Sequence, residues 1–236
     1  IKELYLHDNS FTGNVPPSFT NLQSLRALRL EDNLLSGEIP AFLGMLDSLN
    51  VLYMSGNDLS GNIPEELGDL QQLVILGLGN NNIDGEIPLS IGNIPTLQVL
   101  DLGANKLRGT VPEVLLNCPL SFLQISNNFF TDFPAALTTL SLNSSSNASL
   151  NDFTFEDLQN FPNNLSYTPQ NTNHAYDTTY LIAGTAGTIQ LDFDNEVENS
   201  TYKWYKESNL LGTTTENSIA ITEDIAGTYY YNLEIT

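Results

Sequence analysis

A unit of 24 residues returns five times in the first half of the chain, and it limits the possible folds more than any other feature. Its asparagines fall at Asn9, Asn33, Asn57, Asn81 and Asn105, and its glycines at Gly13, Gly37, Gly61, Gly85 and Gly109. A proline follows each glycine three residues later, and a pair of leucines, or Leu52 with Met54, precedes each asparagine. A repeat of this length is typical of a solenoid, in which each unit buries its apolar face only against its neighbours.

Each repeated position has a physical role. The L-x-L alternation predicts a short strand with two side chains facing inward, and stacked copies predict a parallel sheet with about 4.8 Å between strands. The asparagine that follows can satisfy backbone groups at the turn, so the copies are expected to form a ladder. The Ile or Val before each proline predicts a second row of short strands. The segments 41–48 and 65–72 are expected to return as short helical turns on the convex side.

The unit, written L-x-x-L-x-L-x-x-N-x-L-x-G-x-I-P-x-x-L-x-x-L-x-x, resembles the plant-type leucine-rich repeat of plant receptor ectodomains and polygalacturonase-inhibiting proteins. The resemblance covers residues 1–119. A sixth repeat follows with Asn128 at the ladder position, and a degenerate seventh starts at Leu137. An α/β solenoid of about six to seven repeats is therefore predicted for residues 1–150. Within it, residues 141–152 break the period and are expected to form an irregular loop.

The second half of the chain has a different pattern. Residues 151–172 are expected to form a cap and linker, in which Phe153, Phe155, Leu158 and Phe161 could plug the end of the solenoid. Residues 173–236 consist of short β-rich runs separated by turn signals, which favours a small antiparallel sandwich. Because the chain starts in the middle of a repeat and stops at Thr236 before a final strand, we expect it to be a fragment with a truncated last domain.

The run D-I-A-G-T-Y-Y-Y from Asp224 resembles the D-x-A-G-x-Y-x-C run of immunoglobulin domains, and Trp204 stands 20 residues before it. The resemblance places Leu191 and Tyr231 where such domains carry their two cysteines, which implies apolar packing in place of the disulfide. It also places Tyr229 at the corner tyrosine. Leucine-rich repeats followed by such a module are similar to surface or secreted proteins of Bacteroidetes-type bacteria, which implies an extracellular or cell-surface location.

Cysteine content agrees with that resemblance. Cys118 is the only cysteine, so the paired cap cysteines of plant receptors are absent and no intrachain disulfide can form. Four N-x-S/T sequons are present, at Asn143, Asn147, Asn164 and Asn199. They would be glycosylated in a secreted eukaryotic protein and are ordinary polar loops in a bacterial one.

Charge excludes several classes of partner. The chain has 7 basic and 28 acidic residues, a formal net charge of −21, which repels nucleic acid and anionic lipid. No apolar run approaches the length of a membrane span. The alternating acids Asp192, Asp194 and Glu196 are a weak candidate for calcium, and a solvated strand face explains them better. We expect no cofactor. Because no known catalytic motif is present, we also expect no enzyme activity.

The concave face of the predicted sheet is the best candidate for a binding site. Its outward side chains, read from the repeat, give the candidate ligand-binding residues Tyr5, Arg29, Glu31, Tyr53, Asp101, Phe122 and Gln124. Gly77, Gly79 and Gly103 are expected to leave a shallow trough among them. A third column, formed by Ala27, Val51, Ile75, Val99 and Phe122, is either an apolar binding strip or a row that stabilises the sheet.

Three functions fit this pattern. The first is a non-catalytic extracellular recognition or adhesion module that binds a protein or peptide on the concave face. The second is a carbohydrate-binding surface protein, although the tyrosines Tyr5 and Tyr53 stand two repeats apart and are sparse for stacking on sugars. The third is a structural spacer of a larger enzyme or adhesin. The sequence leaves the oligomeric state open.

Overall fold

The computed structural model describes the residues 1–153, 162 and 165–166, together with six strands in the remainder of the chain. The chain divides into two compact units, residues 1–170 and residues 171–236, which are described separately. Among the described residues, no helix is both long enough and apolar enough to cross a membrane.

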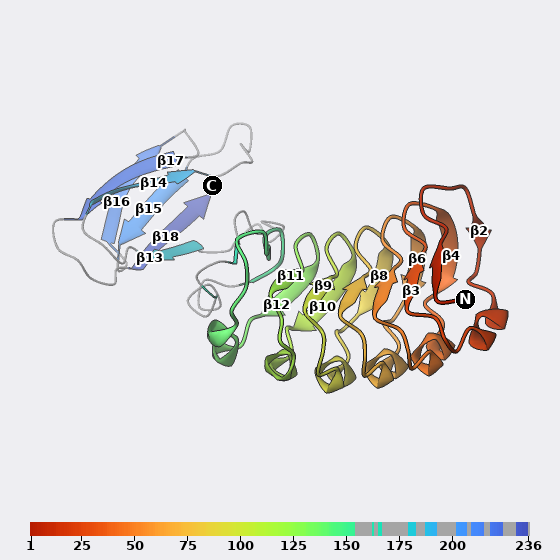
Figure 1. Ribbon diagram of the computed structural model, residues 1–236. Helices are drawn as coiled ribbons and strands as arrows, with labels where there is room; N and C mark the ends of the chain where they lie inside the picture. The colour runs from red at the N-terminus through yellow and green to blue at the C-terminus, as the bar shows by residue number, and fades with distance from the viewer. Residues whose placement is uncertain are drawn as a thin grey trace. The chain divides into compact units, whose positions relative to one another are not determined.

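The first unit is a solenoid built on a parallel sheet of six short strands (Figure 1). The strands are β1 (Glu3–Tyr5), β3 (Ala27–Arg29), β5 (Val51–Tyr53), β7 (Ile75–Gly77), β9 (Val99–Asp101) and β11 (Phe122–Gln124). Equivalent positions of successive repeats pair across this sheet, as Leu28 does with Leu52 and Leu52 with Leu76. The strand positions and the register that the repeat predicts are thus confirmed.

A second parallel sheet of short strands runs along another side of the same coils. It consists of β2 (Thr12–Gly13), β4 (Leu34–Glu38), β6 (Asp58–Gly61), β8 (Asn82–Gly85), β10 (Lys106–Thr110) and β12 (Phe129–Asp132). The repeated glycine lies in these strands with a left-handed backbone, with φ of 82° at Gly37, for example, where a side chain would be strained. This explains why glycine returns every 24 residues.

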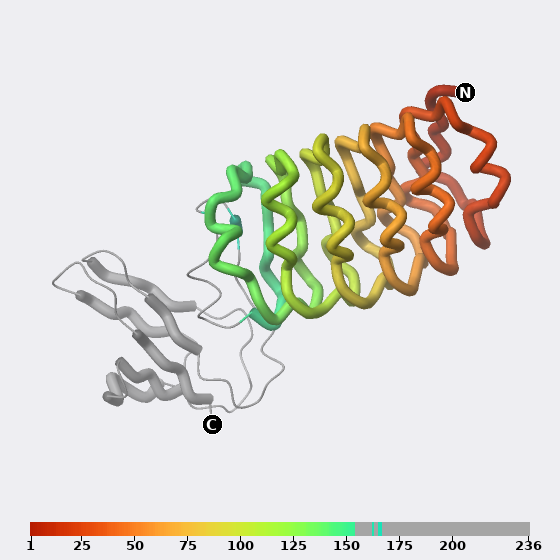
Figure 2. The backbone as a smooth tube through the Cα atoms, turned by 90° about the horizontal axis from the view of Figure 1, so that it is seen from below, coloured from red at the N-terminus to blue at the C-terminus, as the bar shows by residue number. Residues whose placement is uncertain are grey.

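Each coil then turns through one short 3₁₀ helix directly after its proline (Figure 2). These helices are η1 (Pro17–Asn21), η2 (Ala41–Met45), η3 (Glu65–Asp69), η4 (Leu89–Asn93), η5 (Glu113–Asn117) and η6 (Ala135–Thr139). Proline lies at the position before the helix in an extended conformation, with φ −73° and ψ 127° at Pro40. Helices of this type are used in short pieces, often as connectors, and five residues is toward the long end of their range. The expected helical turns are thereby confirmed.

The core is a stack of aliphatic columns inside the coils. The leucines at the centre of the strands, Leu28, Leu52, Leu76, Leu100 and Leu123, are fully buried. A second column, two residues further along the chain in each coil, is almost as deeply buried. Its members are no more than 3% exposed: Leu30, Met54, Leu78, Leu102 and Ile125. Burial of one such side chain stabilises the fold by about 1.5–3 kcal/mol. No coil has a core of its own, so stability depends on neighbouring coils.

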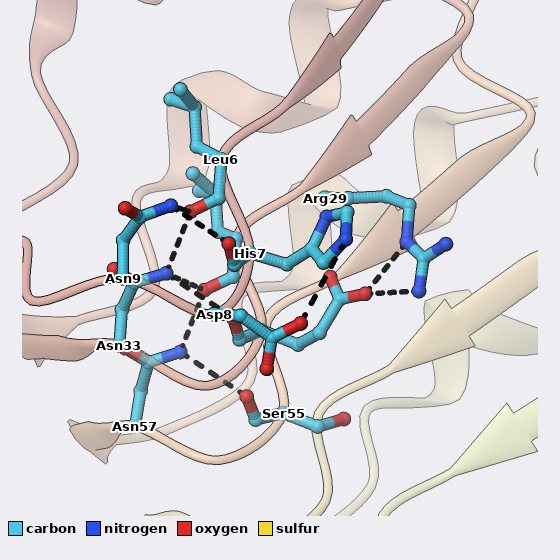
Figure 3. A network of polar contacts seen from close by, with 10 residues as sticks. Leu6, His7, Asp8, Asn9, Arg29, Asn33, Ser55 and Asn57 are labelled. Atoms are coloured by element: carbon cyan, nitrogen blue, oxygen red, sulfur yellow. Dashed lines mark hydrogen bonds and ion pairs between the residues drawn. The ribbon is translucent and has the colours of Figure 1, made fainter.

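The asparagine ladder is present and is buried (Figure 3). The Asn57 side chain donates from Nδ2 to the carbonyl oxygens of Leu30 at 3.0 Å and Met54 at 3.1 Å, and its Oδ1 accepts from the Leu35 amide at 2.9 Å. Each ladder asparagine therefore links its own coil to the preceding one. The same pattern recurs in a series of six: Asn33, Asn57, Asn81, Asn105, Asn128 and Asn151.

Residues 141–152 differ from the irregular loop expected for them. Asn151 is fully buried and continues the ladder, with its Oδ1 accepting from the Phe130 amide at 3.1 Å. Ser146 and Ala148 occupy the two inward positions that leucines fill elsewhere. The period was hidden because small residues replace large ones while the backbone course is kept.

The end of the solenoid is closed as far as the structure describes it. Phe153 is buried and packs against Phe130 and Phe133, with ring centroids 6.5 and 6.0 Å away. A parallel bridge joins Asn147 to Ser166, beside the buried Leu165. Phe153 therefore has the predicted capping role. The other three predicted cap residues, Phe155, Leu158 and Phe161, lie outside the described part.

The second unit contains two antiparallel sheets. One has the order β13 (Thr179–Ile182), β18 (Tyr230–Ile235), β15 (Tyr202–Lys206) and β16 (Asn209–Thr214), and the other pairs β14 (Gly187–Asp192) with β17 (Ser218–Glu223). The immunoglobulin-like sandwich stays a prediction. Asp224 and Tyr229 lie outside the described residues, as do the side chains of Leu191, Trp204 and Tyr231.

Candidate ligand-binding face

Three neighbouring strands place one large side chain each on the concave side of the sheet. Tyr5, Arg29 and Tyr53 are register partners on β1, β3 and β5, and we call them the concave row. The side chain of Tyr5 is exposed, whereas those of Arg29 and Tyr53 are half-buried. Because strands alternate their side chains between two faces, the buried leucines between them force these three toward solvent.

Arg29 is held in place from two sides. Its Nε donates to Glu31 Oε1 at 2.6 Å, and its guanidinium forms an ion pair with the same carboxylate. Its guanidinium carbon lies 5.3 Å from the centroid of the Tyr53 ring, a cation–π contact. The hydrogen bond to Glu31 is the main reason that the pKa of Arg29 is raised. Arg29 is therefore a fixed cation on the concave face.

Tyr5 is the most open member of the concave row, with 53% of its surface exposed. Its hydroxyl donates to Glu3 Oε2 at 2.8 Å, and that bond raises the pKa of the hydroxyl. Its ring meets His7 edge to face, with 6.3 Å between centroids. Tyr5 thus presents the face of its ring to solvent, while its hydroxyl is bonded to Glu3 on the same strand.

The trough predicted above the glycines is largely filled by neighbouring side chains. A Cβ on Gly77 would collide with the Tyr53 ring, and one on Gly79 would lie 2.8 Å from Asp101 Oδ1. A Cβ on Gly103 would lie 2.9 Å from Gln124 Cγ. Each glycine therefore makes room for the side chain of an adjacent strand. The concave face is therefore flatter than the sequence predicted, and the Tyr53 ring lies against the backbone at Gly77.

Asp101 fills the space over Gly79 and is half-buried. Its Oδ1 accepts a hydrogen bond from the Gly103 amide at 3.1 Å. Burial raises the pKa of the Asp101 carboxyl, and the hydrogen bond offsets part of that rise. Asp101 therefore carries its charge in a place where the fold disfavours it.

An apolar strip runs beside the concave row. It consists of Ala27, Val51, Ile75, Val99 and Phe122, which are register partners across five strands. Ala27 is buried and the other four are half-buried. Part of this surface is thus already covered within the sheet, and part of it remains open to a ligand.

The predicted site residues do not form one cluster. Tyr5, Arg29, Glu31 and Tyr53 lie together on the first three coils, while Asp101, Phe122 and Gln124 lie on β9 and β11. Glu31, expected on the open surface, is only 8% exposed because Arg29 lies against it. Within the described residues, no three His, Cys, Asp or Glu side chains could hold a metal ion. Asp194 and Glu196 fall outside that part, as does the Asp192 side chain.

Models of the leucine-rich repeat match residues 1–59, 72–94 and 96–118. No curated protein sequence matches the chain. Solved structures do match it, and the three described next cover 71–72% of this chain.

The ectodomain of the Arabidopsis thaliana receptor kinase GASSHO1/SCHENGEN3, in complex with CASPARIAN STRIP INTEGRITY FACTOR 2, is 30% identical over 71% of this chain and 21% of its own, with a TM-score of 0.63. The Arabidopsis receptor kinase HAESA, in complex with the peptide hormone IDA and the co-receptor SERK1, is 32% identical over 71% of this chain and 30% of its own, with a TM-score of 0.62. A plant ice-binding protein is 29% identical over 72% of this chain and 56% of its own, with a TM-score of 0.62.

The chain thus spans between about a fifth and just over a half of these solved chains. The matched repeats, the two rows of parallel strands and the buried asparagine ladder agree with one another. The first unit of this chain is a leucine-rich repeat solenoid.

Proposed function

We propose that the chain is a non-catalytic recognition module that binds a protein or peptide on the concave face of its solenoid. The observation that carries the proposal is the concave row of Tyr5, Arg29 and Tyr53, with the apolar strip alongside it. Tyrosine and arginine are the residues that most often dominate binding energy at protein interfaces. A strip of aliphatic side chains beside them offers apolar area to bury.

Preorganisation supports the same function. The contacts of Arg29 with Glu31 and Tyr53 fix its guanidinium before any ligand arrives. Because less side-chain freedom is then lost on binding, a larger share of the contact energy appears as affinity. An arginine that is fixed and still 41% exposed at its side chain is well suited to hold a polar group of a ligand.

Similar solved structures give further support. The receptor kinase HAESA was solved with the peptide hormone IDA, and the peptide hormone receptor RGFR1 with RGF2. Because these chains share the repeat with the present one, a peptide or protein is the ligand class that we propose for it. The resemblance to ectodomains also supports an extracellular or cell-surface location.

The role of the second unit is part of the proposal. We assign residues 173–236 to an immunoglobulin-like spacer, because β14 pairs with β17 while β15 pairs with β18. The two sheets of such domains are built on equivalent pairings. We also propose an adhesion role, because leucine-rich repeats followed by such a module resemble surface proteins of Bacteroidetes-type bacteria.

Selection from a random peptide library against the full chain tests the proposed function. We expect selected peptides to lose at least about tenfold in affinity on Arg29→Ala or Tyr53→Ala, since each removes an interface anchor. Arg108→Ala, an exposed arginine on β10 of the second sheet, is the matched control and should leave affinity unchanged. Peptides that bind equally well to all three variants would contradict the proposal. Binding to a glycan array in place of peptides would support the carbohydrate-binding alternative.

A further inference from the structure

Three buried polar atoms on the first three coils have no hydrogen-bond partner among the described residues. They are His7 Nδ1, Glu31 Oε2 and Ser55 Oγ, and we call these residues the acceptor row. Figure 3 shows the His7 imidazole beside Arg29 and Ser55 farther along, near Asn57. The Arg29 guanidinium contacts the Glu31 carboxylate. Glu31 is a charged residue that is only 8% exposed, and leaving one of its carboxylate oxygens without a partner is costly, so such a group usually has a reason to be there.

The fold places the three residues side by side. Each stands two residues after the concave row, at equivalent positions of successive repeats. Backbone bonds keep the coils in register there: the Asp8 amide donates to the Glu31 carbonyl at 3.1 Å, and the Asp32 amide to the Ser55 carbonyl at 2.9 Å. Adjacent members are thus separated by about one strand spacing of 4.8 Å. A small group can therefore contact Glu31 together with one of its two neighbours, whereas His7 and Ser55 stand about 9.6 Å apart, two strand spacings.

The chemistry of the three atoms is that of acceptors. Glu31 uses Oε1 for Arg29, and its second carboxylate oxygen can only accept. The Ser55 hydroxyl can accept as well. His7 Nε2 lies 3.9 Å from Asp8 Oδ2, and the tautomer with its proton on Nε2 leaves Nδ1 as an acceptor. A primary ammonium group carries three N–H donors, so it can donate to Glu31 Oε2 and to one neighbouring acceptor at the same time.

We propose that the acceptor row binds a primary ammonium group of a peptide, either a lysine side chain or a free N-terminus. This inference rests on the proposed function, whose ligand it specifies. The His7 side chain is 34% exposed and the Glu31 side chain 11%, so the group enters past the imidazole from the concave side. The net charge of −21 raises the local concentration of cationic ligands.

The first test uses n-butylamine as the probe and the full chain as the target. Titration at neutral pH, followed by the NMR signals of the His7 imidazole, is expected to give a saturable shift in the wild type. Glu31→Gln should abolish the shift, because the amide removes the negative charge and adds a donor. Glu38→Gln neutralises an exposed carboxylate on β4 and should leave it intact. Absence of a saturable shift at His7 in the wild type would overturn the proposal.

The second test uses peptides selected against the chain. Acetylation of the N-terminus and acetylation of lysine, made separately, identify which amine is bound. The relevant one should weaken binding about tenfold or more, as expected for a hydrogen-bonded charge. In Glu31→Gln that acetylation should cost nothing further, and Ser55→Ala should give a smaller loss. Because a folded variant is required, the thermal midpoint of each variant is measured beside its affinity.

The two proposals fail in different ways. Peptides that lose affinity on Tyr53→Ala but tolerate acetylation of every amine would overturn the ammonium site and leave peptide recognition standing. Peptides that are insensitive to both Tyr53→Ala and Arg29→Ala would overturn recognition by the concave row. A butylamine shift that survives Glu31→Gln would also overturn the site, because it would then not depend on the carboxylate.

Discussion

At the scale of single residues, the ladder asparagines do more than any other side chain to define the solenoid. Asn81 donates to the carbonyls of Met54 and Leu78, both at 3.0 Å, and accepts from the Leu59 amide at 3.0 Å. It is 8% exposed, so water does not easily replace these bonds. One side chain therefore satisfies backbone groups of two coils at a buried turn.

Replacement of Asn81 by alanine is expected to lower the free energy of unfolding by about 2–5 kcal/mol, because several buried backbone groups lose their partner. Asn9→Ala is the matched control: Asn9 is exposed, and its side chain donates to the carbonyls of Leu6 and His7 in its own coil. It should cost about 0.5–1 kcal/mol. Urea unfolding followed by circular dichroism measures both. Equal losses would show that burial of the ladder adds no stability.

Asp101 gives a prediction about pH. Its pKa in the fold is raised above the ordinary value of 3.8 by burial, so the folded chain holds this proton more tightly than the unfolded chain. The group therefore lowers stability progressively as pH rises through the interval between 3.8 and the raised folded pKa. Asp101→Asn removes the charge and keeps an acceptor for Gly103.

We expect Asp101→Asn to unfold at higher urea than the wild type at pH 7, with the difference shrinking as pH falls toward 4. Asp58→Asn, at an exposed position of β6, is the control and should give a smaller difference. A wild type that is more stable than Asp101→Asn at pH 7 would mean that the Asp101 charge is stabilising, contrary to this account.

At the scale of elements, the 3₁₀ helices pack so closely that they determine the spacing of the convex side. A Cβ placed on Gly68 in η3 would collide with the backbone carbonyl of Ser90 in η4, and one on Gly44 would collide with Glu66 in the same way. Glycine at the fourth position of η2, η3 and η4 therefore makes room for the next coil. Gly44, Gly68 and Gly92 share this packing role.

Gly68→Ala is expected to destabilise the chain by about 1–3 kcal/mol, because neither backbone can move away without disturbing the sheets. Asp69→Ala, at the next residue of the same helix, is exposed and should change stability by less than about 0.5 kcal/mol. Thermal unfolding of the two variants provides the comparison. A neutral Gly68→Ala would indicate that adjacent helices can separate freely.

The sequence predicted elements far better than it predicted the site. Strand positions, register and core columns follow from the leucines, asparagines and glycines, because repetition fixes them five times over. The sixth repeat is one residue shorter, and the structure absorbs this with a register shift between Gly109 and Thr110. The seventh repeat was predicted from Leu137, out of register with its ladder residue Asn151, because Ser146 and Ala148 replace the leucines of that coil.

The site could be predicted only as a face. The columns correctly placed Tyr5, Arg29 and Tyr53 beside one another, since register alone decides that. They could not show that Glu31 is buried under Arg29, or that Tyr53 covers Gly77. Both depend on which way a long side chain leans along the sheet, and a repeat pattern carries no information about rotamers.

At the scale of the whole molecule, the first unit is a series of similar coils in which each contacts only its neighbours. Its core and its ladder are continuous, yet no bond of the ladder joins residues more than 27 positions apart in the sequence. Stability is then close to a sum of coil and interface contributions. The concave row, in contrast, lies on the first three coils alone.

The ladder also determines how the solenoid responds to force. Each ladder asparagine joins one coil to the coil before it. A force that pulls on the two ends of the solenoid therefore acts on these hydrogen bonds between coils, which follow one another along the chain. The end coil, which has one neighbour, yields first, and the next coil becomes the new end. The coils should therefore unfold one after another. Each unfolding event should lengthen the chain by about 80 Å, the extended length of 24 residues.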